Sequence, residues 1–182
     1  MADWTISSGD YMRPYRTQGS DAGSIDFGYE SSVAQSYPVG ALLEFDSTFN
    51  TLRAASTTGS TVNSVRVIGV AAEPASSIAN NTRIYWAIQP HQEFMARTRG
   101  GVLGSTTVGV KCGIFRDSSK GVYLLDFGNK VSTSVLAVVT GLIDAAGDSG
   151  GYVRFKFGAD IQTVDSAATP VGFAPQAQPL RF

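Results

Sequence analysis

The sequence predicts an all-β protein: a small antiparallel β-barrel or β-tulip-like domain with an extended N-terminal arm and a C-terminal tail. Short runs of β-branched, aromatic and aliphatic residues follow one another between Pro38 and Gly158, and clusters of turn-forming residues separate them. No stretch shows the apolar period of a long amphipathic helix. Many short strands separated by turns are typical of barrels and sandwiches, so we expect this kind of architecture.

The composition supports a β-rich protein that meets partners. The chain has 182 residues, which is enough for one domain with a sizeable core. Charged residues make up 16% of it, well below the roughly 25% of an average soluble domain. Low charge with many glycines suggests a surface that is partly covered by partners. The net charge of −1 predicts no general attraction to nucleic acid or to an anionic membrane.

Strand-forming runs fill most of the segment 38–158, which we expect to be the β domain. The expected strands lie at 38–46, 49–56, 65–73, 82–89, 92–99, 110–115, 122–127, 134–143 and 152–158. In the last run, apolar and polar side chains alternate with a period of two, the pattern of a half-buried antiparallel strand. We expect a loop at 56–64, a glycine-rich segment with at most a short helical turn at 100–109, and a turn at 116–121.

Residues 1–37 are expected to form an N-terminal arm without a regular element. Aromatic residues are scattered among Ser, Gly and Asp here, and they repeat at neither the helical nor the strand period. They are Trp4, Tyr11, Tyr15, Phe27, Tyr29 and Tyr37. Such a segment cannot bury enough surface alone, so it packs along its own domain or a neighbour. For residues 1–10 a disordered leader is the alternative.

Residues 159–182 are expected to form an extended C-terminal tail. Pro170, Pro175 and Pro179 interrupt any strand pairing, because each proline fixes φ and removes a donor. The apolar side chains available as anchors are Val171, Phe173, Leu180 and Phe182. Docking of this tail on a partner and a disordered terminus are the two interpretations.

The run GDSGG at 147–151 has the form of the nucleophile loop of chymotrypsin-like serine proteases. A Ser149 nucleophile needs a histidine base, and the only histidine is His91, with Asp117 or Asp126 as the orienting carboxylate. The spacing from His91 to Ser149 is too short for that fold, which places the two residues on separate barrels. Strand-like runs flank the motif on both sides, so we expect a hairpin loop and no enzyme.

Other chemistry finds little support in the sequence. The single cysteine, Cys112, is expected to be a small buried strand residue, and one Cys with one His makes a zinc site implausible. Asp144 and Asp148 are expected to form turns, since they lack the spacing of a calcium loop. We expect no cofactor and no metal. The first 15 residues have no apolar core of a signal peptide, and no run approaches the about 18 apolar residues of a membrane helix.

The middle of the chain carries a series of motifs in a characteristic order. They are YPVGALLEFDSTFNTLRAA, VRVIGVAAEPASS, TRIYWAIQPHQEFMART, GVYLLDFGNK and VLAVVTGLIDAAGDSGGYVRFKF. This series resembles the head decoration, or cement, proteins of tailed bacteriophages, over about residues 37–158. The long N-terminal arm and the proline-rich tail depart from the shortest members of that family.

The resemblance implies a structural protein of the virion. Such proteins form trimers or other homo-oligomers on the outside of an icosahedral head, where they clamp neighbouring subunits of the major capsid protein. The expected location is the outer surface of the particle, assembled in the host cytoplasm, with no nucleic-acid or membrane partner. The residues expected to contact the shell or a neighbouring copy are Tyr11, Tyr15, Phe27, Tyr29, Phe173, Leu180 and Phe182.

Two other functions remain open at this stage. A receptor- or glycan-binding module of a phage tail or fibre would share the β fold, and an exposed aromatic platform with sugar binding would favour it. A hydrolase that uses Ser149 is the third alternative, and labelling by a serine-reactive fluorophosphonate would favour it. The sequence leaves open which arm contacts the shell.

Overall fold

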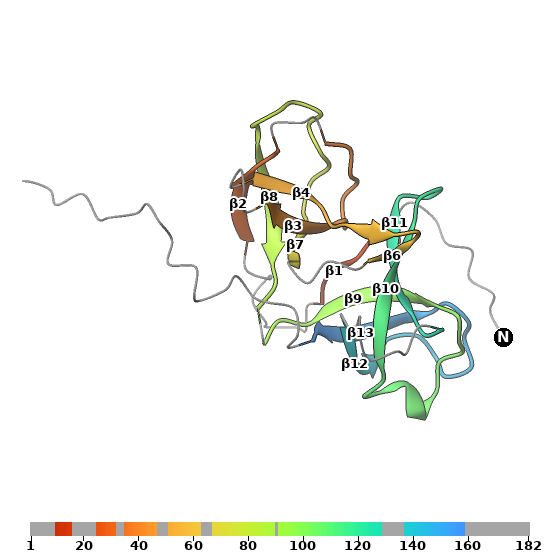
Figure 1. The fold of residues 1–182 in the computed structure, drawn as a ribbon. Helices are drawn as coiled ribbons and strands as arrows, with labels where there is room; N and C mark the ends of the chain where they lie inside the picture. The colour runs from red at the N-terminus through yellow and green to blue at the C-terminus, as the bar shows by residue number, and fades with distance from the viewer. Residues whose placement is uncertain are drawn as a thin grey trace, which may run out of the picture.

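A computed structural model describes residues 10–15, 25–31, 35–46, 51–62, 67–89, 91–128 and 137–158. The described residues contain strands, turns and one 3-10 turn, η1 (Ser105–Thr107), but no α-helix. They form a closed barrel and a second curved sheet that lie side by side (Figure 1). The predicted all-β class and the predicted barrel are therefore confirmed.

Five strands form the barrel, and their pairings return to the starting strand. In ring order they are β9 (Phe94–Arg99), β13 (Tyr152–Phe157), β12 (Ala137–Leu142), β10 (Lys111–Asp117) and β11 (Val122–Asp126). The ring closes between β11 and β9 by a parallel pairing, Leu125 with Thr98 and Asp126 with Arg99. The other four pairs of neighbouring strands in the ring are antiparallel as expected, and this seam is the exception. An odd number of strands cannot alternate in direction all the way round a closed ring.

The two predicted hairpins of the barrel are confirmed. Strand β10 pairs with β11 across the turn at 118–121, where the Asp117 carboxylate accepts hydrogen bonds from the Ser119 and Lys120 amides. Strand β12 pairs with β13, and Val153 and Phe155 are buried while their neighbours are half-buried. The period-two pattern of the sequence thus corresponds to the alternation of buried and half-buried side chains along most of β13.

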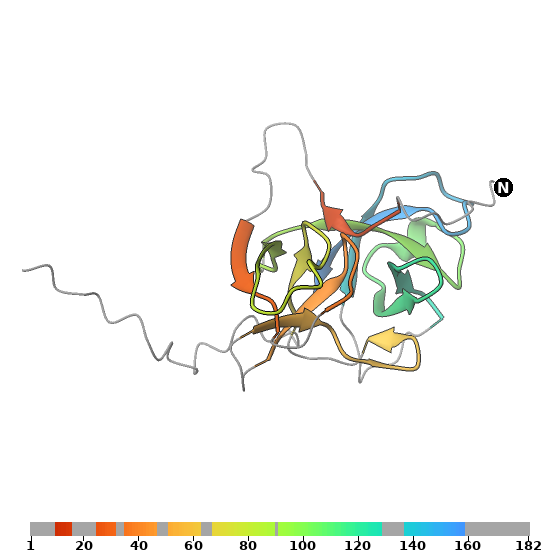
Figure 2. The ribbon, with the colours of Figure 1, turned by 90° about the horizontal axis from the view of Figure 1, so that it is seen from above.

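The second sheet also contains five strands. Their order is β2 (Ile25–Tyr29), β8 (Thr82–Ala87), β7 (Val67–Ala71), β3 (Leu42–Asp46) and β4 (Thr51–Ala54). The sheet curls until its two outer strands approach, because Glu30, directly after β2, forms a parallel bridge with Leu52 of β4. Figure 2 shows β2 at the outer side of this sheet, away from the barrel.

Two sequence-based expectations about irregular segments are wrong. The predicted arm contributes β1 (Arg13–Pro14), which pairs with β9, and also the whole of β2. The predicted loop 56–64 contains a tight hairpin, β5 (Thr57–Thr58) and β6 (Thr61–Val62), which continues the barrel sheet through β10. Strands β1 and β2 are formed by pairing with β9 and β8, which lie far along the chain, whereas β5 and β6 pair with each other across a two-residue turn.

A single hydrophobic core joins the barrel, the second sheet and the N-terminal segment 10–15. Met12 is fully buried among these core residues, with no exposed surface. The segment passes close to Gly40, where a Cβ atom would lie 2.9 Å from the backbone N of Met12 and where φ is +78°. Cys112 is buried in β10 as predicted, and burial raises the pKa of its thiol to about 12.

We predict that Met12→Ala lowers the free energy of unfolding by about 2–5 kcal/mol, because it leaves a cavity in the shared core. Val108→Ala is the control, since the Val108 side chain is 49% exposed and such changes stay within about 0.5 kcal/mol. Urea denaturation followed by circular dichroism measures both. Equal stability of the two variants would mean that segment 10–15 is not part of the folded domain.

Candidate docking surface

Strand β2 exposes its apolar side chains to solvent, while Asp26, itself exposed, and the buried Glu30 directly after the strand make polar contacts with the rest of the chain. Ile25, Phe27 and Tyr29 are 53%, 62% and 60% exposed. The side chains of Asp26 and Glu30 alternate with them and make hydrogen bonds within the second sheet. An ordinary half-buried strand has the opposite arrangement. The solvent-facing row is therefore a surface feature that the core of this chain does not use.

Glu30 fixes this orientation of β2. Its carboxylate is fully buried and accepts hydrogen bonds from the Ser76 amide at 3.0 Å and from the Ser76 hydroxyl. The Arg83 guanidinium lies 3.9 Å away. Burial and the nearby Glu30 carboxylate raise the pKa of the Tyr37 hydroxyl above its ordinary value. Moving this carboxylate away from its partners while it stays buried would cost much free energy, because a buried charge without partners is unfavourable.

Two further residues hold β2 on its inner side. The Tyr85 hydroxyl donates to the Asp26 carboxylate at 3.1 Å. The pKa of this hydroxyl is raised, mainly because it is buried and also because the Asp26 carboxylate is close. A Cβ atom at Gly28 would lie 2.7 Å from the Leu52 side chain, so the glycine lets β2 approach β4 closely. Together with Glu30, these contacts determine the register of the strand.

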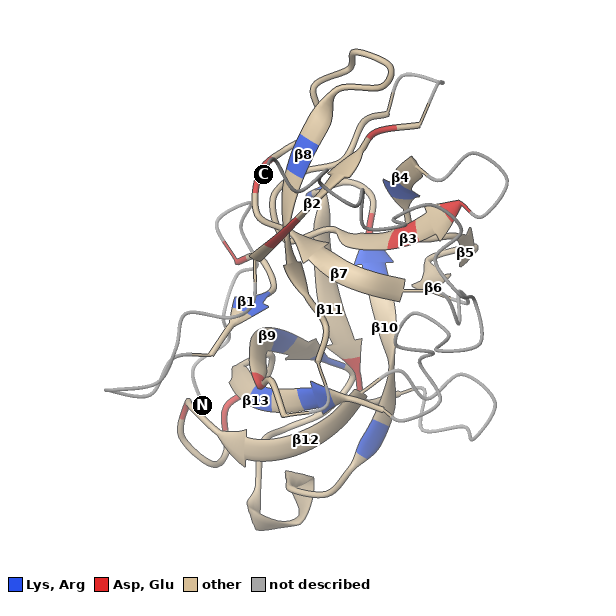
Figure 3. Cartoon of the chain, turned by 90° about the vertical axis from the view of Figure 1, so that its left-hand side faces the viewer, with Lys and Arg blue, Asp and Glu red and all other residues tan. Residues whose placement is uncertain are grey.

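Strand β8 extends the apolar row into a face. Antiparallel pairing places Phe27 opposite Ile84 and Ile25 opposite Trp86, and directly paired residues project on the same side of a sheet. We call these residues the outer apolar face: Ile25, Phe27, Tyr29, Ile84 and Trp86. Figure 3 looks onto this side of the molecule, where charged residues are few and singly placed along β2 and β8.

An open pocket of about 370 Å³ adjoins this face at Trp86. Its lining residues are Tyr11, Arg13, Pro14, Tyr15, Trp86 and Met95, and we call it the aromatic pocket. They come from β1 and its flanks, from β8 and from β9. This volume lies within the range of about 300–1,000 Å³ that is usual for ligand sites.

Contacts to the barrel hold the pocket residues of segment 10–15 in place. The Asp10 carboxylate lies 2.8 Å from the Arg97 guanidinium and accepts a 2.8 Å hydrogen bond from the Tyr152 hydroxyl. The Tyr15 amide donates to the Glu93 carbonyl at 2.9 Å. The Arg154 guanidinium lies 5.1 Å from the centroid of the Tyr15 ring, within cation–π distance. The pocket wall is thus preorganised rather than loose.

The residues predicted from the sequence as partner contacts separate into three groups. Phe27 and Tyr29 lie on the outer apolar face, and Tyr11 and Tyr15 line the aromatic pocket. The remaining predictions lie outside the described residues; they are Phe173, Leu180 and Phe182.

Sequence reasoning missed several residues of these surfaces. Ile25, Ile84 and Met95 were not predicted as contacts, and neither was Trp86, which packs against the hydrophobic core and also lines the aromatic pocket. The run IDFGYE at 25–30 does carry a strand period, with apolar residues at every second position. The statement that this segment has no such period is therefore wrong.

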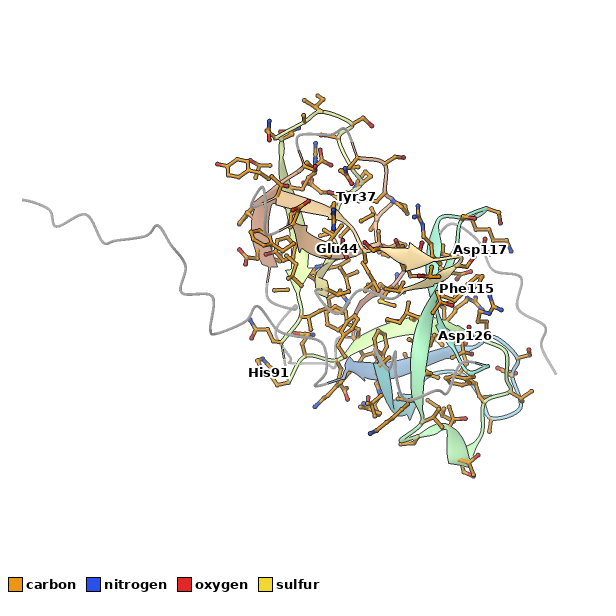
Figure 4. All side chains as sticks on the ribbon, in the orientation of Figure 1. Tyr37, Glu44, His91, Phe115, Asp117 and Asp126 are labelled. Carbon is orange, nitrogen blue, oxygen red and sulfur yellow. The ribbon has the colours of Figure 1, made fainter. Side chains whose placement is uncertain are left out.

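The structure does not assemble the protease arrangement suggested by GDSGG. Ser149 belongs to the predicted β12–β13 hairpin loop and bridges to Val102 beyond the end of β9, whereas His91 is exposed before its start. Figure 4 shows His91 on one side of the molecule and Asp117 and Asp126 on the other. The stretch from Phe94 to Thr98 alone is roughly 13 Å of strand, far beyond hydrogen-bond reach.

Among the described ranges, no group of three or more His, Cys, Asp or Glu side chains is arranged to hold a metal ion. Within the same ranges, no helix is long and apolar enough to span a membrane.

Comparisons with known proteins add no assignment. No protein family model matches the chain, and no curated protein matches it in sequence.

We predict that the double substitution Phe27→Thr with Tyr29→Thr changes the free energy of unfolding by less than about 1 kcal/mol. Both side chains are mostly exposed, and threonine keeps the strand preference of the site. The matched substitution Leu52→Ala on β4 removes a buried side chain and should cost about 2–5 kcal/mol. Thermal and urea denaturation distinguish them. A large loss in the double variant would show that the outer apolar face supports the fold itself.

Proposed function

We propose that the protein is a structural component of a phage particle, a decoration or cement protein that binds the outside of the icosahedral head. The observation that carries the proposal is the outer apolar face, which β2 presents to solvent while its polar residues anchor it to the second sheet. Exposed apolar rows of this kind mark protein–protein contact sites. The motif series that resembles cement proteins supports the choice of partner, the major capsid protein.

The physical mechanism is mechanical clamping. Phe27 and Tyr29 enter apolar depressions at a junction between capsid subunits, and Ile25 and Trp86 border them. Aromatic side chains dominate such contacts, because they bury a large area and lose little conformational freedom. The face lies on the ordered strands of the second sheet, which limits the entropy lost on binding. A homo-oligomer, expected to be a trimer, binds the repeating lattice through several copies of one modest contact, so its overall affinity exceeds that of a single subunit.

A receptor- or glycan-binding module of a tail or fibre is the second candidate. The aromatic pocket favours it, since Tyr11, Tyr15 and Trp86 provide rings on which a sugar can stack. Isothermal titration with oligosaccharides of the host surface would separate the two candidates. Sugar binding that is lost in Tyr15→Ala, together with a few copies per particle, would replace the cement proposal.

The copy number in particles is the first test. Quantitative mass spectrometry of purified particles from the source gives the ratio of this chain to the major shell protein. A ratio near one, or a fixed simple fraction, is expected for a cement protein. A handful of copies points to the tail or fibre, and absence from particles overturns both virion proposals.

We predict that Phe27→Thr with Tyr29→Thr weakens binding to undecorated heads by at least about tenfold, which corresponds to about 1.4 kcal/mol. Val108→Thr is the matched control, because it removes an exposed apolar side chain that follows η1, between β9 and β10 of the barrel rather than in the second sheet. Co-sedimentation with heads and the temperature at which heads release their genome are the readouts. Binding by the double variant as tight as that of the control would refute docking through this face.

A further inference from the structure

We propose that the aromatic pocket is a binding site for a proline-rich extended segment, and that its occupant is the chain's own segment 169–182. This segment reads TPVGFAPQAQPLRF and carries Pro170, Pro175 and Pro179. The inference does not rest on the proposed function, because it concerns the isolated protein and the pocket rather than the outer apolar face.

The lining of the pocket matches the chemistry of a polyproline II ligand. Proline-rich segments dock in grooves lined by aromatic rings, against which the pyrrolidine rings pack, and the prolines fix the extended conformation beforehand. Tyr11, Tyr15 and Trp86 supply three such rings, and Pro14 and Met95 add apolar surface. The aromatic side chains of the pocket have few torsion angles that binding must fix, so little conformational entropy is lost.

The polar groups of the lining also suit this ligand better than a sugar. A polyproline II chain leaves its backbone carbonyls without internal hydrogen bonds, and each proline lacks an N–H group. The lining offers donors: the hydroxyls of Tyr11 and Tyr15, the guanidinium of Arg13 and the indole N–H of Trp86. None of the six lining side chains is a carboxylate or an amide, so the pocket has few acceptors for the hydroxyl groups of a sugar.

Strand β13, the last strand before the tail, is two strands away from the segment that lines the pocket. Strand β13 ends at Phe157, whose ring packs 5.0 Å from the ring of Phe94 between centroids, and Phe94 pairs with Pro14 of β1. The strands β13, β9 and β1 are neighbours, so roughly 10 Å separates the end of β13 from the pocket wall. Residues 159–169 can span about 35 Å when extended, which is more than enough.

This proximity favours docking within one chain over docking between copies. A segment tethered next to its site reaches it at an effective concentration in the millimolar range, above the usual concentration of a second copy in solution. Association of the tail with the pocket would cover the rings of Tyr11 and Tyr15, which are half-buried without it.

Photocrosslinking of the full chain tests the inference. A Tyr15→p-benzoylphenylalanine substitution places the probe on the pocket wall, and Phe27→p-benzoylphenylalanine is the matched control on the outer apolar face. After irradiation, mass spectrometry should locate crosslinks from position 15 in peptides of residues 169–182, in a product with the mass of one chain. The yield there should exceed that of the control by roughly tenfold or more.

A second pair of variants makes the ligand chemistry testable. Substituting alanine at Pro170, Pro175 and Pro179 should lower the crosslink yield from position 15 by severalfold, whereas Gln176→Ala with Gln178→Ala should leave it unchanged. Near-ultraviolet circular dichroism verifies that each variant is folded. Crosslinks that fall elsewhere, that appear equally from position 27, or that join two chains through the tail would overturn the inference. A protein that fails to bind heads but shows the expected crosslinks would contradict only the proposed function.

Discussion

The burial of Glu30 is the constraint on which the exposed surface depends. A fully buried carboxylate requires partners, and the Ser76 amide and hydroxyl together with Arg83 provide them. Because side chains alternate along a strand, the inward position of Glu30 obliges Tyr29, Phe27 and Ile25 to face outward. A slip by one residue would remove the carboxylate from its partners. It would also place an aromatic side chain next to Leu52, at the position where the strands are so close that only Gly28 fits.

The barrel gives these surfaces a rigid base. Its closure leaves no free edge around the ring, and the N-terminal segment is attached to it by strand pairing and by the contacts of Asp10 with Arg97 and Tyr152. The aromatic pocket exists only because β1 docks on β9, since its lining comes from segments that are more than 70 residues apart in the chain. A surface that is already ordered loses little entropy when a partner binds.

The two surfaces meet at Trp86, which belongs both to the outer apolar face and to the lining of the aromatic pocket. In the proposed function the face contacts the shell, while in the further inference the pocket holds the chain's own tail. Both events would therefore involve Trp86, so contact with the shell and docking of the tail meet at this one side chain.

The sequence by itself determined the all-β class, the strands between residues 38 and 158 other than β5 and β6, the β12–β13 hairpin around GDSGG and the burial of Cys112. These features follow from local signals, namely period-two alternation and turn residues, which act over a few positions. Phe27 and Tyr29 were also identified as contact candidates from their aromatic character in a polar segment.

Only the tertiary structure decided which face of β2 is outward, the parallel seam between β11 and β9, and the gathering of Tyr11, Tyr15 and Trp86 around one pocket. Each of these depends on pairings between residues far apart in the chain. A local pattern specifies that side chains alternate, but it does not specify which side meets the core. In β2 that choice was made by a buried carboxylate whose partners lie about 45 to 55 positions away, at Ser76 and Arg83.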